Sequence, residues 1–260
     1  MKTTIGKAPA IGFILFQGVN AEGVPYSVVA TLESSNTKTG NMVTVWIIRT
    51  DAHPSVARAE SKGKDHPTCL DCPLAIAGCY VQIEHAPAAV WRALMAGRYV
   101  PYNAAIHAKL LKRRSIRWGG YGDPVLIPLP IVEDLSALCV GGWTGYTHQW
   151  AKPDYQGYRR FFMASVHSIA QRDRAWAKGW RTFRDCTTLE AEPIGRGEMG
   201  CPAAKENGER LQCIDCMICN GNDRAIGHKA RASVVIVRHA NAVQTKILAK
   251  ALRTGAVSFA

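Results

Sequence analysis

The stretch "FFMASVHSIAQRDRAWAKGWRTFRD", residues 161–185, decides the fold class of this chain. It opens with a short apolar run typical of a buried strand, continues with a helical pattern over residues 167–179 that ends in glycine, and closes with a second strand-like run. A strand, a helix and a strand in this order predict two parallel strands joined by a right-handed crossover.

The same alternation extends in both directions from this unit. It predicts helices at 86–97, 103–114, 130–140 and 241–255, and strands at 115–120, 142–148 and 231–239. Two further strands, 25–32 and 41–49, flank a turn-rich segment. We therefore expect an α/β fold: a partial (β/α) barrel of mostly parallel strands over 66–260, a β-rich N-terminal extension over 1–65, and cysteine-rich metal-binding loops, one of them an insertion at about 195–225.

The net charge of +12 favours polyanionic partners, with nucleic acid or a nucleotide as the expected substrate class. A solvated basic surface explains the same charge without a partner, and the densest run, Lys109–Arg117, lies where it could also follow a helix C-terminus. The chain has no run of eighteen apolar residues, and its apolar run at 11–16 is short for a secretory signal. We expect a cytoplasmic protein with no membrane partner.

Seven of the nine cysteines fall into two groups. Cys213, Cys216 and Cys219 are each two residues apart, and Cys201 precedes them with a proline after it. Zinc sites usually take separated Cys-x2-Cys pairs, whereas three cysteines at this spacing with a distant Cys-Pro are typical of [4Fe-4S] clusters. The pattern favours an iron–sulfur cluster with a complete ligand set and leaves zinc as the alternative.

The first group, Cys69, Cys72 and Cys79, offers only three thiolates. His66 or His85 could complete a Cys3His zinc site, or the fourth position could stay open for an added ligand. Cys139 and Cys186 stand apart, and we interpret both as buried structural residues.

Polar residues follow several predicted strands, where sites of parallel α/β folds usually lie. They occur in "GGYGDP", "THQW", "SVHS" and "RDC", and each could also be an ordinary turn. From these groups we predict substrate contacts from Tyr146, His148, Gln149, Ser165 and Arg184. Five aromatic residues could stack on a base, although for each one taken singly core packing is the favoured explanation: Tyr121, Trp143, Tyr146, Trp150 and Trp180.

Several of these signatures together resemble the radical S-adenosylmethionine superfamily, and more closely a set of phage proteins related to it. The shared features are Cys79-Tyr80, "YGDP" at 121–124, "GWTGYTHQW" at 142–150, "MASV" at 163–166, "GWRTFR" at 179–184 and the C-terminal cysteine group. The likeness covers roughly residues 36–240.

The resemblance implies that Cys69, Cys72 and Cys79 hold a [4Fe-4S] cluster whose open iron binds S-adenosylmethionine, with an electron donor as a further partner. Gly119, Gly120, Tyr121 and Asp123 would contact the adenosylmethionine. The superfamily usually spaces its cysteines Cys-x3-Cys-x2-Cys, whereas this chain has Cys-x2-Cys-x6-Cys. No catalytic side chain is assigned.

Three functions remain open at this point. The chain is a radical enzyme of this type, a zinc-stabilised nucleic-acid-binding protein without activity, or a relative that keeps the fold and clusters and has lost the chemistry.

Overall fold

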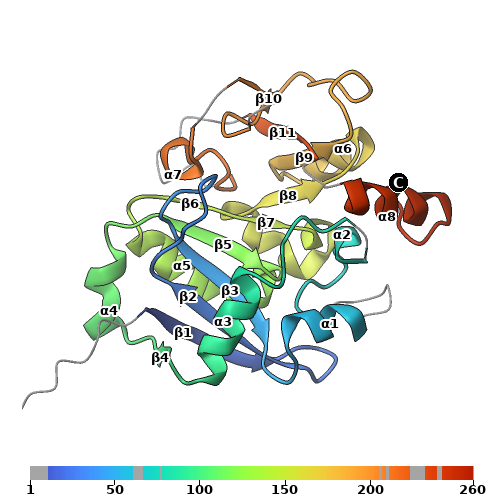
Figure 1. Cartoon of the computed structure of the whole chain (residues 1–260). Coiled ribbons are helices and arrows are strands. Elements are labelled where there is room, and N and C mark those ends of the chain that lie inside the picture. The colour runs from blue at the N-terminus through green and yellow to red at the C-terminus, as the bar shows by residue number, and fades with distance from the viewer. Residues whose placement is uncertain are drawn as a thin grey trace, which may run out of the picture.

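Parallel strands dominate the two sheets of this chain (Figure 1). The computed structural model describes residues 11–60, 67–76, 78–204, 207–208, 211–222, 232–238 and 242–259. The strands are β1 (Gly12–Val19), β2 (Pro25–Thr31), β3 (Val43–Arg49), β4 (Val100–Pro101), β5 (Ile116–Tyr121), β6 (Trp143–Thr144), β7 (Tyr146–Thr147), β8 (Met163–Val166), β9 (Thr182–Cys186), β10 (Glu198–Gly200) and β11 (Ser233–Val237). The α-helices are α1 (Pro54–Glu60), α2 (Pro73–Ile76), α3 (Ala86–Met95), α4 (Ala104–Leu111), α5 (Leu129–Leu138), α6 (Ile169–Ala177), α7 (Cys213–Cys216) and α8 (Ala242–Arg253).

The first sheet has the order β4-β1-β2-β3-β5-β6, and the second has the order β10-β11-β9-β8-β7. Among the described strands, only the pairs β1–β2 and β2–β3 are antiparallel, and the other pairs are parallel. The prediction of an α/β fold with mostly parallel strands is therefore confirmed. The N-terminal strands extend the first sheet, since β3 pairs with β5.

The chain passes from the first sheet to the second at Gly145, between β6 and β7. The Gly145 amide donates to the Cys219 carbonyl, and its own carbonyl accepts from the Met163 amide. A Cβ at this position would lie 2.6 Å from the Phe162 ring, so a larger residue could not make the passage without displacing that ring.

Alternate side chains of the strands enter two different sets of contacts. On one face, Trp118, Phe162 and Ala164 belong to the largest hydrophobic core, which includes residues of α5 and α6. On the other face, α3 covers Val29 and Ile48. Further along this second face, Met163 and Ile236 pack against Cys201 and Cys219.

Gly119 and Gly120 lie inside β5, within the strand predicted at 115–120. Residues 153–160, just before β8, form a 3-10 helix. Within the described ranges, no helix is long and apolar enough to cross a membrane.

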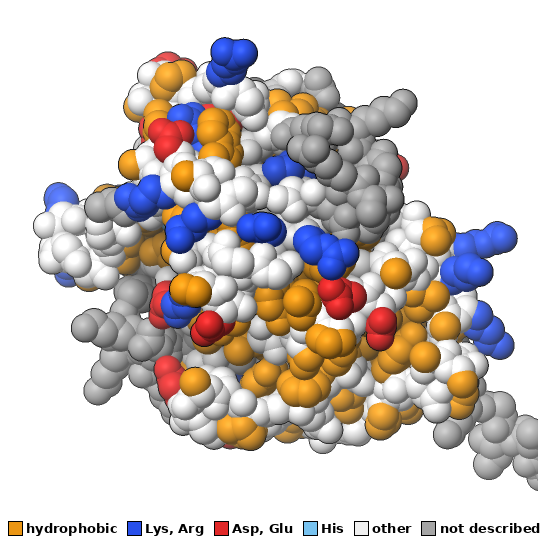
Figure 2. Space-filling view, turned by 180° about the vertical axis from the view of Figure 1, so that it is seen from behind, with side chains coloured by type: hydrophobic (Ala, Val, Ile, Leu, Met, Phe, Trp, Pro, Cys, Tyr) orange, Lys and Arg blue, Asp and Glu red, His pale blue; other side chains and the backbone are white. Residues whose placement is uncertain are grey.

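Lysine and arginine side chains occur as several separate groups on the face shown in Figure 2, next to a broad hydrophobic area. That face shows no continuous basic stripe of the kind that follows a nucleic-acid backbone.

Candidate functional site

Cys201, Cys213, Cys216 and Cys219 line one pocket of about 40 Å³, which we call the four-cysteine pocket. By the same measure one water needs roughly 10–15 Å³. The pocket is also lined by side chains of four strands and of the β2–β3 loop: Thr144, Tyr146, Phe183, Ile236 and Lys38. The sequence prediction that these four cysteines form one group agrees with this arrangement.

Hydrogen bonds from two residues, Arg181 and Cys201, fix the cysteine-rich loop on the sheet. The Arg181 guanidinium, just before β9, donates to the carbonyls of Ile218, Gly221 and Ala232 and to the side chain of Asn220 at 2.6–3.0 Å. The Cys201 amide, just after β10, donates to the Val235 carbonyl at 2.8 Å. These bonds place Cys201 and Cys219 over the second sheet.

The β2–β3 loop closes the pocket from the opposite side. The Cys213 amide donates to the Lys38 carbonyl at 3.0 Å, and the Ile214 amide donates to the Thr39 carbonyl at 3.1 Å. The Gln212 side chain donates to the Thr37 carbonyl at 2.8 Å. The N-terminal strands therefore contribute part of the site as well as part of the sheet.

Burial raises the pKa of Cys201, Cys213 and Cys219, so it favours the protonated form of these three thiols. The Tyr146 hydroxyl forms a hydrogen bond with Cys219, and Arg117 and Lys38 favour the thiolate of Cys213. A bound metal would supply the larger charge needed to ionise these ligands.

Cys69, Cys72 and Cys79 form the second set of donors, which we call the three-cysteine group. Burial raises the pKa of Cys69 and Cys72, and the nearby Cys79 raises both further. The loop folds tightly here, since the Cys72 amide donates to the Cys69 carbonyl at 3.2 Å. The three thiols predicted to act together therefore lie close to one another.

Polar side chains follow successive parallel strands next to this group. Sγ of Cys72 lies 3.7 Å from Nε2 of His148, which follows β7. The same nitrogen lies 3.1 Å from Nε2 of His167, which follows β8. Nδ1 of His167 contacts the Asp185 carboxylate of β9, which also accepts from Arg238 after β11. We call His148, His167, Asp185 and Arg238 the edge row.

The charges in the edge row are set by burial and by its ion pair. Burial and the neighbouring His167 lower the pKa of His148 to about 3, so His148 is neutral at pH 7. Burial alone would raise the pKa of Asp185, but His167 and Arg238 hold it well below its usual range. The row therefore presents a neutral imidazole to Cys72 and holds a carboxylate between His167 and Arg238.

Asp123, after β5, orients the backbone that carries His148. Its carboxylate accepts from the His148 amide at 3.0 Å and from the Val125 amide at 3.2 Å. Burial raises the pKa of this carboxyl to about 6 despite these bonds. Its own amide donates to the Thr68 carbonyl at 2.7 Å, next to Cys69.

The other predicted residues are placed less favourably for ligand contact. Tyr121, Trp143, Trp150 and Trp180 are buried in hydrophobic cores. Gln149 is buried, and its side-chain amide has no hydrogen-bond partner among the described residues. Ser165 is partly exposed on β8. Cys139 and Cys186 are buried as expected. His85 is exposed at the start of α3, and His66 lies outside the described residues.

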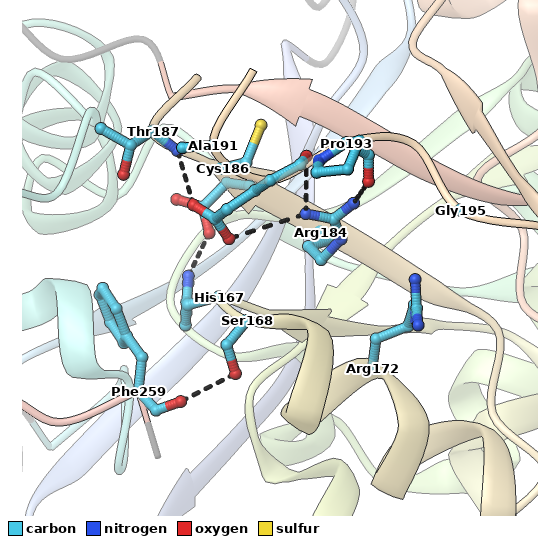
Figure 3. Close-up of polar contacts among 12 residues, drawn as sticks. His167, Ser168, Arg172, Arg184, Cys186, Thr187, Ala191, Pro193, Gly195 and Phe259 are labelled. Atoms are coloured by element: carbon cyan, nitrogen blue, oxygen red, sulfur yellow. Dashed lines mark hydrogen bonds and ion pairs between the residues drawn. The ribbon is translucent and has the colours of Figure 1, made fainter. Parts of the chain in front are cut away.

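Arg184 is engaged by protein groups. Its fully buried guanidinium donates to both carboxylate oxygens of Glu198 at 2.8 and 2.9 Å and to the Pro193 carbonyl at 2.9 Å. Figure 3 shows Arg184 reaching toward Pro193, while His167 lies beside Phe259, whose carbonyl accepts from Ser168.

Sequence reasoning selected Arg184 and overlooked Asp185 and His167. Successive strand residues point to opposite faces, so a shift of one position moves a side chain from the edge row to the opposite side of the sheet. The sequence pattern that could have indicated both residues is a histidine after one predicted strand and an aspartate at the end of the next predicted strand.

Within the described ranges, no three His, Cys, Asp or Glu side chains are arranged to hold a single metal ion. No family model matches the chain, and neither a curated protein nor a solved structure matches it.

Proposed function

We propose that this chain is an iron–sulfur protein with two clusters in a partial (β/α) barrel, and that it performs radical chemistry with S-adenosylmethionine. The observation that carries the proposal is the grouping of seven cysteines into two compact sets, one around α2 and one lining the four-cysteine pocket. The parallel order β3-β5-β6 followed by β7-β8-β9-β11 supports the barrel.

The donor geometry favours clusters over single ions. In a zinc site, four sulfurs surround a single ion tetrahedrally, with Zn–S bonds of about 2.3 Å. Here four cysteines line a pocket without converging as ligands of one ion. A four-iron cluster occupies a larger volume and holds its ligands apart, so it suits a lined pocket better.

The two sets would play different roles. Cys201, Cys213, Cys216 and Cys219 would complete all four positions of one cluster, which then serves in structure or electron transfer. Cys69, Cys72 and Cys79 would leave one position free for S-adenosylmethionine, whose reductive cleavage supplies a radical when it is bound.

The residues around the three-cysteine group would orient its loop and shield the free coordination position from water. Asp123 fixes the backbone at His148, and the neutral His148 ring lies against Cys72. Leu248 of α8 packs with Leu74 of α2, so the C-terminal helix covers the loop that carries Cys72 (Figure 1). These contacts restrict water around the donors.

The test is the iron and acid-labile sulfide content of protein purified without oxygen. We expect about eight of each per chain for two four-iron clusters. Cys219→Ser should reduce both numbers by about half, and Cys72→Ser should do the same for the other set. Cys139→Ser, a buried cysteine outside both sets, is the matched control and should leave the content unchanged.

The radical step needs a separate measurement. Reduced protein with S-adenosylmethionine should release methionine and 5′-deoxyadenosine, and Cys72→Ser should abolish the release. About two zincs per chain with no sulfide would refute the iron–sulfur proposal and leave the zinc-stabilised binding protein. Iron and sulfide without cleavage would leave a cluster protein without radical chemistry.

A further inference from the structure

Arg117 lies between the two sets of cysteines. On β5 it is in register with Thr144 of β6, which lines the four-cysteine pocket, so the two side chains share one face. Nη2 of Arg117 donates to the Tyr80 hydroxyl at 3.5 Å, and Tyr80 directly follows Cys79 of the three-cysteine group. Among the described residues, no carboxylate forms an ion pair with Arg117.

Tyr80 presents its ring to solvent at this same place. The residue is 56% exposed, although it directly follows the partly buried Cys79. Its hydroxyl is turned toward the protein, because it accepts the hydrogen bond from Arg117 of β5. Ring surface therefore remains accessible to a ligand while the hydroxyl stays beside Arg117.

Strand β7 of the second sheet adds a second tyrosine to this region. Tyr146 is partly exposed, packs its ring 4.4 Å from that of Phe183, and forms a hydrogen bond with Cys219. Arg117 lies near Tyr146. A ligand that reaches Arg117 would thus meet aromatic side chains next to the guanidinium.

We propose that Tyr80 and Arg117 form a binding site for a mononucleotide, with the base stacked on Tyr80 and the phosphate held by Arg117. Arginine pairs with phosphate through two parallel N–H···O bonds, and an exposed ring stacks on any base. The net charge of +12 attracts the same anion. The inference rests on the proposed function in one respect: it makes the nucleotide the substrate, bound between the two metal centres.

Isothermal titration calorimetry on the full chain, with its metal content recorded, tests the site. The probes are adenosine 5′-monophosphate, adenosine and inorganic phosphate. We expect the nucleotide to bind at least tenfold more tightly than either of the other two, since only the nucleotide engages both side chains.

The variants separate the two contacts. Arg117→Gln should remove the preference for nucleotide over adenosine. Tyr80→Leu should weaken both of these ligands by about tenfold, whereas Tyr80→Phe keeps the ring and should bind like the wild type. Arg113→Gln changes an exposed arginine before the same strand and should have no effect.

Equal binding of the nucleotide by Arg117→Gln and the wild type, at unchanged metal content, would overturn the site. So would adenosine or phosphate binding as tightly as the nucleotide. Nucleotide binding that depends on Arg117 in a protein without iron would support the site while refuting the cluster proposal, so the two failures are distinguishable.

Discussion

Replacing Arg181 with methionine should open the loop that carries Cys219. The guanidinium donates at 2.8 Å to the Ile218 carbonyl, at 2.7 Å to the Ala232 carbonyl, at 2.6 Å to the Gly221 carbonyl and at 3.0 Å to Asn220 Oδ1. Methionine keeps a comparable apolar stem but donates no hydrogen bond. Three backbone carbonyls would then lose their partner at the edge of the four-cysteine pocket.

Two opposing contributions determine how much free energy the Arg181 hydrogen bonds add to closure of the loop. A hydrogen bond from a charged donor contributes roughly 1.5–3 kcal/mol, so four bonds sum to about 6–12 kcal/mol. Desolvation of the guanidinium offsets part of this, as the lowered pKa of Arg181 indicates. Breaking such a buried network costs about 3–5 kcal/mol, and we expect that loss in the free energy of loop opening.

The assay is the rate at which a chelator removes iron from the native protein. A loss of about 3 kcal/mol in the free energy of loop opening increases the open population about 100-fold, so half of the iron should leave about 100-fold faster. Arg159→Met, which removes one exposed 3.4 Å contact, is the control and should change the rate little. Iron loss at the wild-type rate, or equal acceleration for both halves of the iron, would refute the reasoning.

Three further predictions concern stability. Burial raises the pKa of Asp123 to about 6 in the folded protein, against 3.8 for a free aspartate, so its protonated form stabilises the fold below about pH 4. The free energy of unfolding should fall by about 3 kcal/mol as the pH rises from there through 6. Chemical denaturation of metal-free protein should show this loss in the wild type and not in Asp123→Asn. Gly122→Ala should cost at least 2 kcal/mol more than Gly23→Ala in urea melts, because both residues have φ of +80° but only the first would place a Cβ 2.6 Å from Ile47; equal costs would contradict the steric argument. Arg184→Met should destabilise by about 3–5 kcal/mol, and adding Glu198→Leu should recover part of it, since the second change removes a buried carboxylate that only Arg172, among the described side chains, would still pair; additive losses would count against a coupled pair.

The strand–helix alternation was predictable because each element carries its own periodicity. Residues 161–185 alone contain the pattern of β8, α6 and β9, and β8 pairs with β9 in parallel as predicted. β10 was not predicted, because its three residues, Glu198–Gly200, are too few to show a period. Its pairing with β11 depends on a long segment folding back, which local sequence does not encode.

The site was predictable to the level of the cysteines and less so beyond them. Cysteine spacing indicated the two groups of thiols that lie together in the structure, and their role as metal ligands stays a prediction. The partners of those donors come from distant segments: Lys38 from the β2–β3 loop and His167 from the strand after Gly145. Sequence order gives no distance between such residues, so only the fold shows that they meet.

The contact between the β2–β3 loop and the four-cysteine loop also constrains biosynthesis. The hydrogen bond from Gln212 to Thr37 joins residues 175 positions apart. At about 5–20 residues per second, the ribosome releases the first partner many seconds before the second. The first hairpin can fold meanwhile, but its tip waits for the later loop. The four-cysteine pocket is therefore completed late in translation, and any cofactor delivered to it must arrive after most of the chain has emerged.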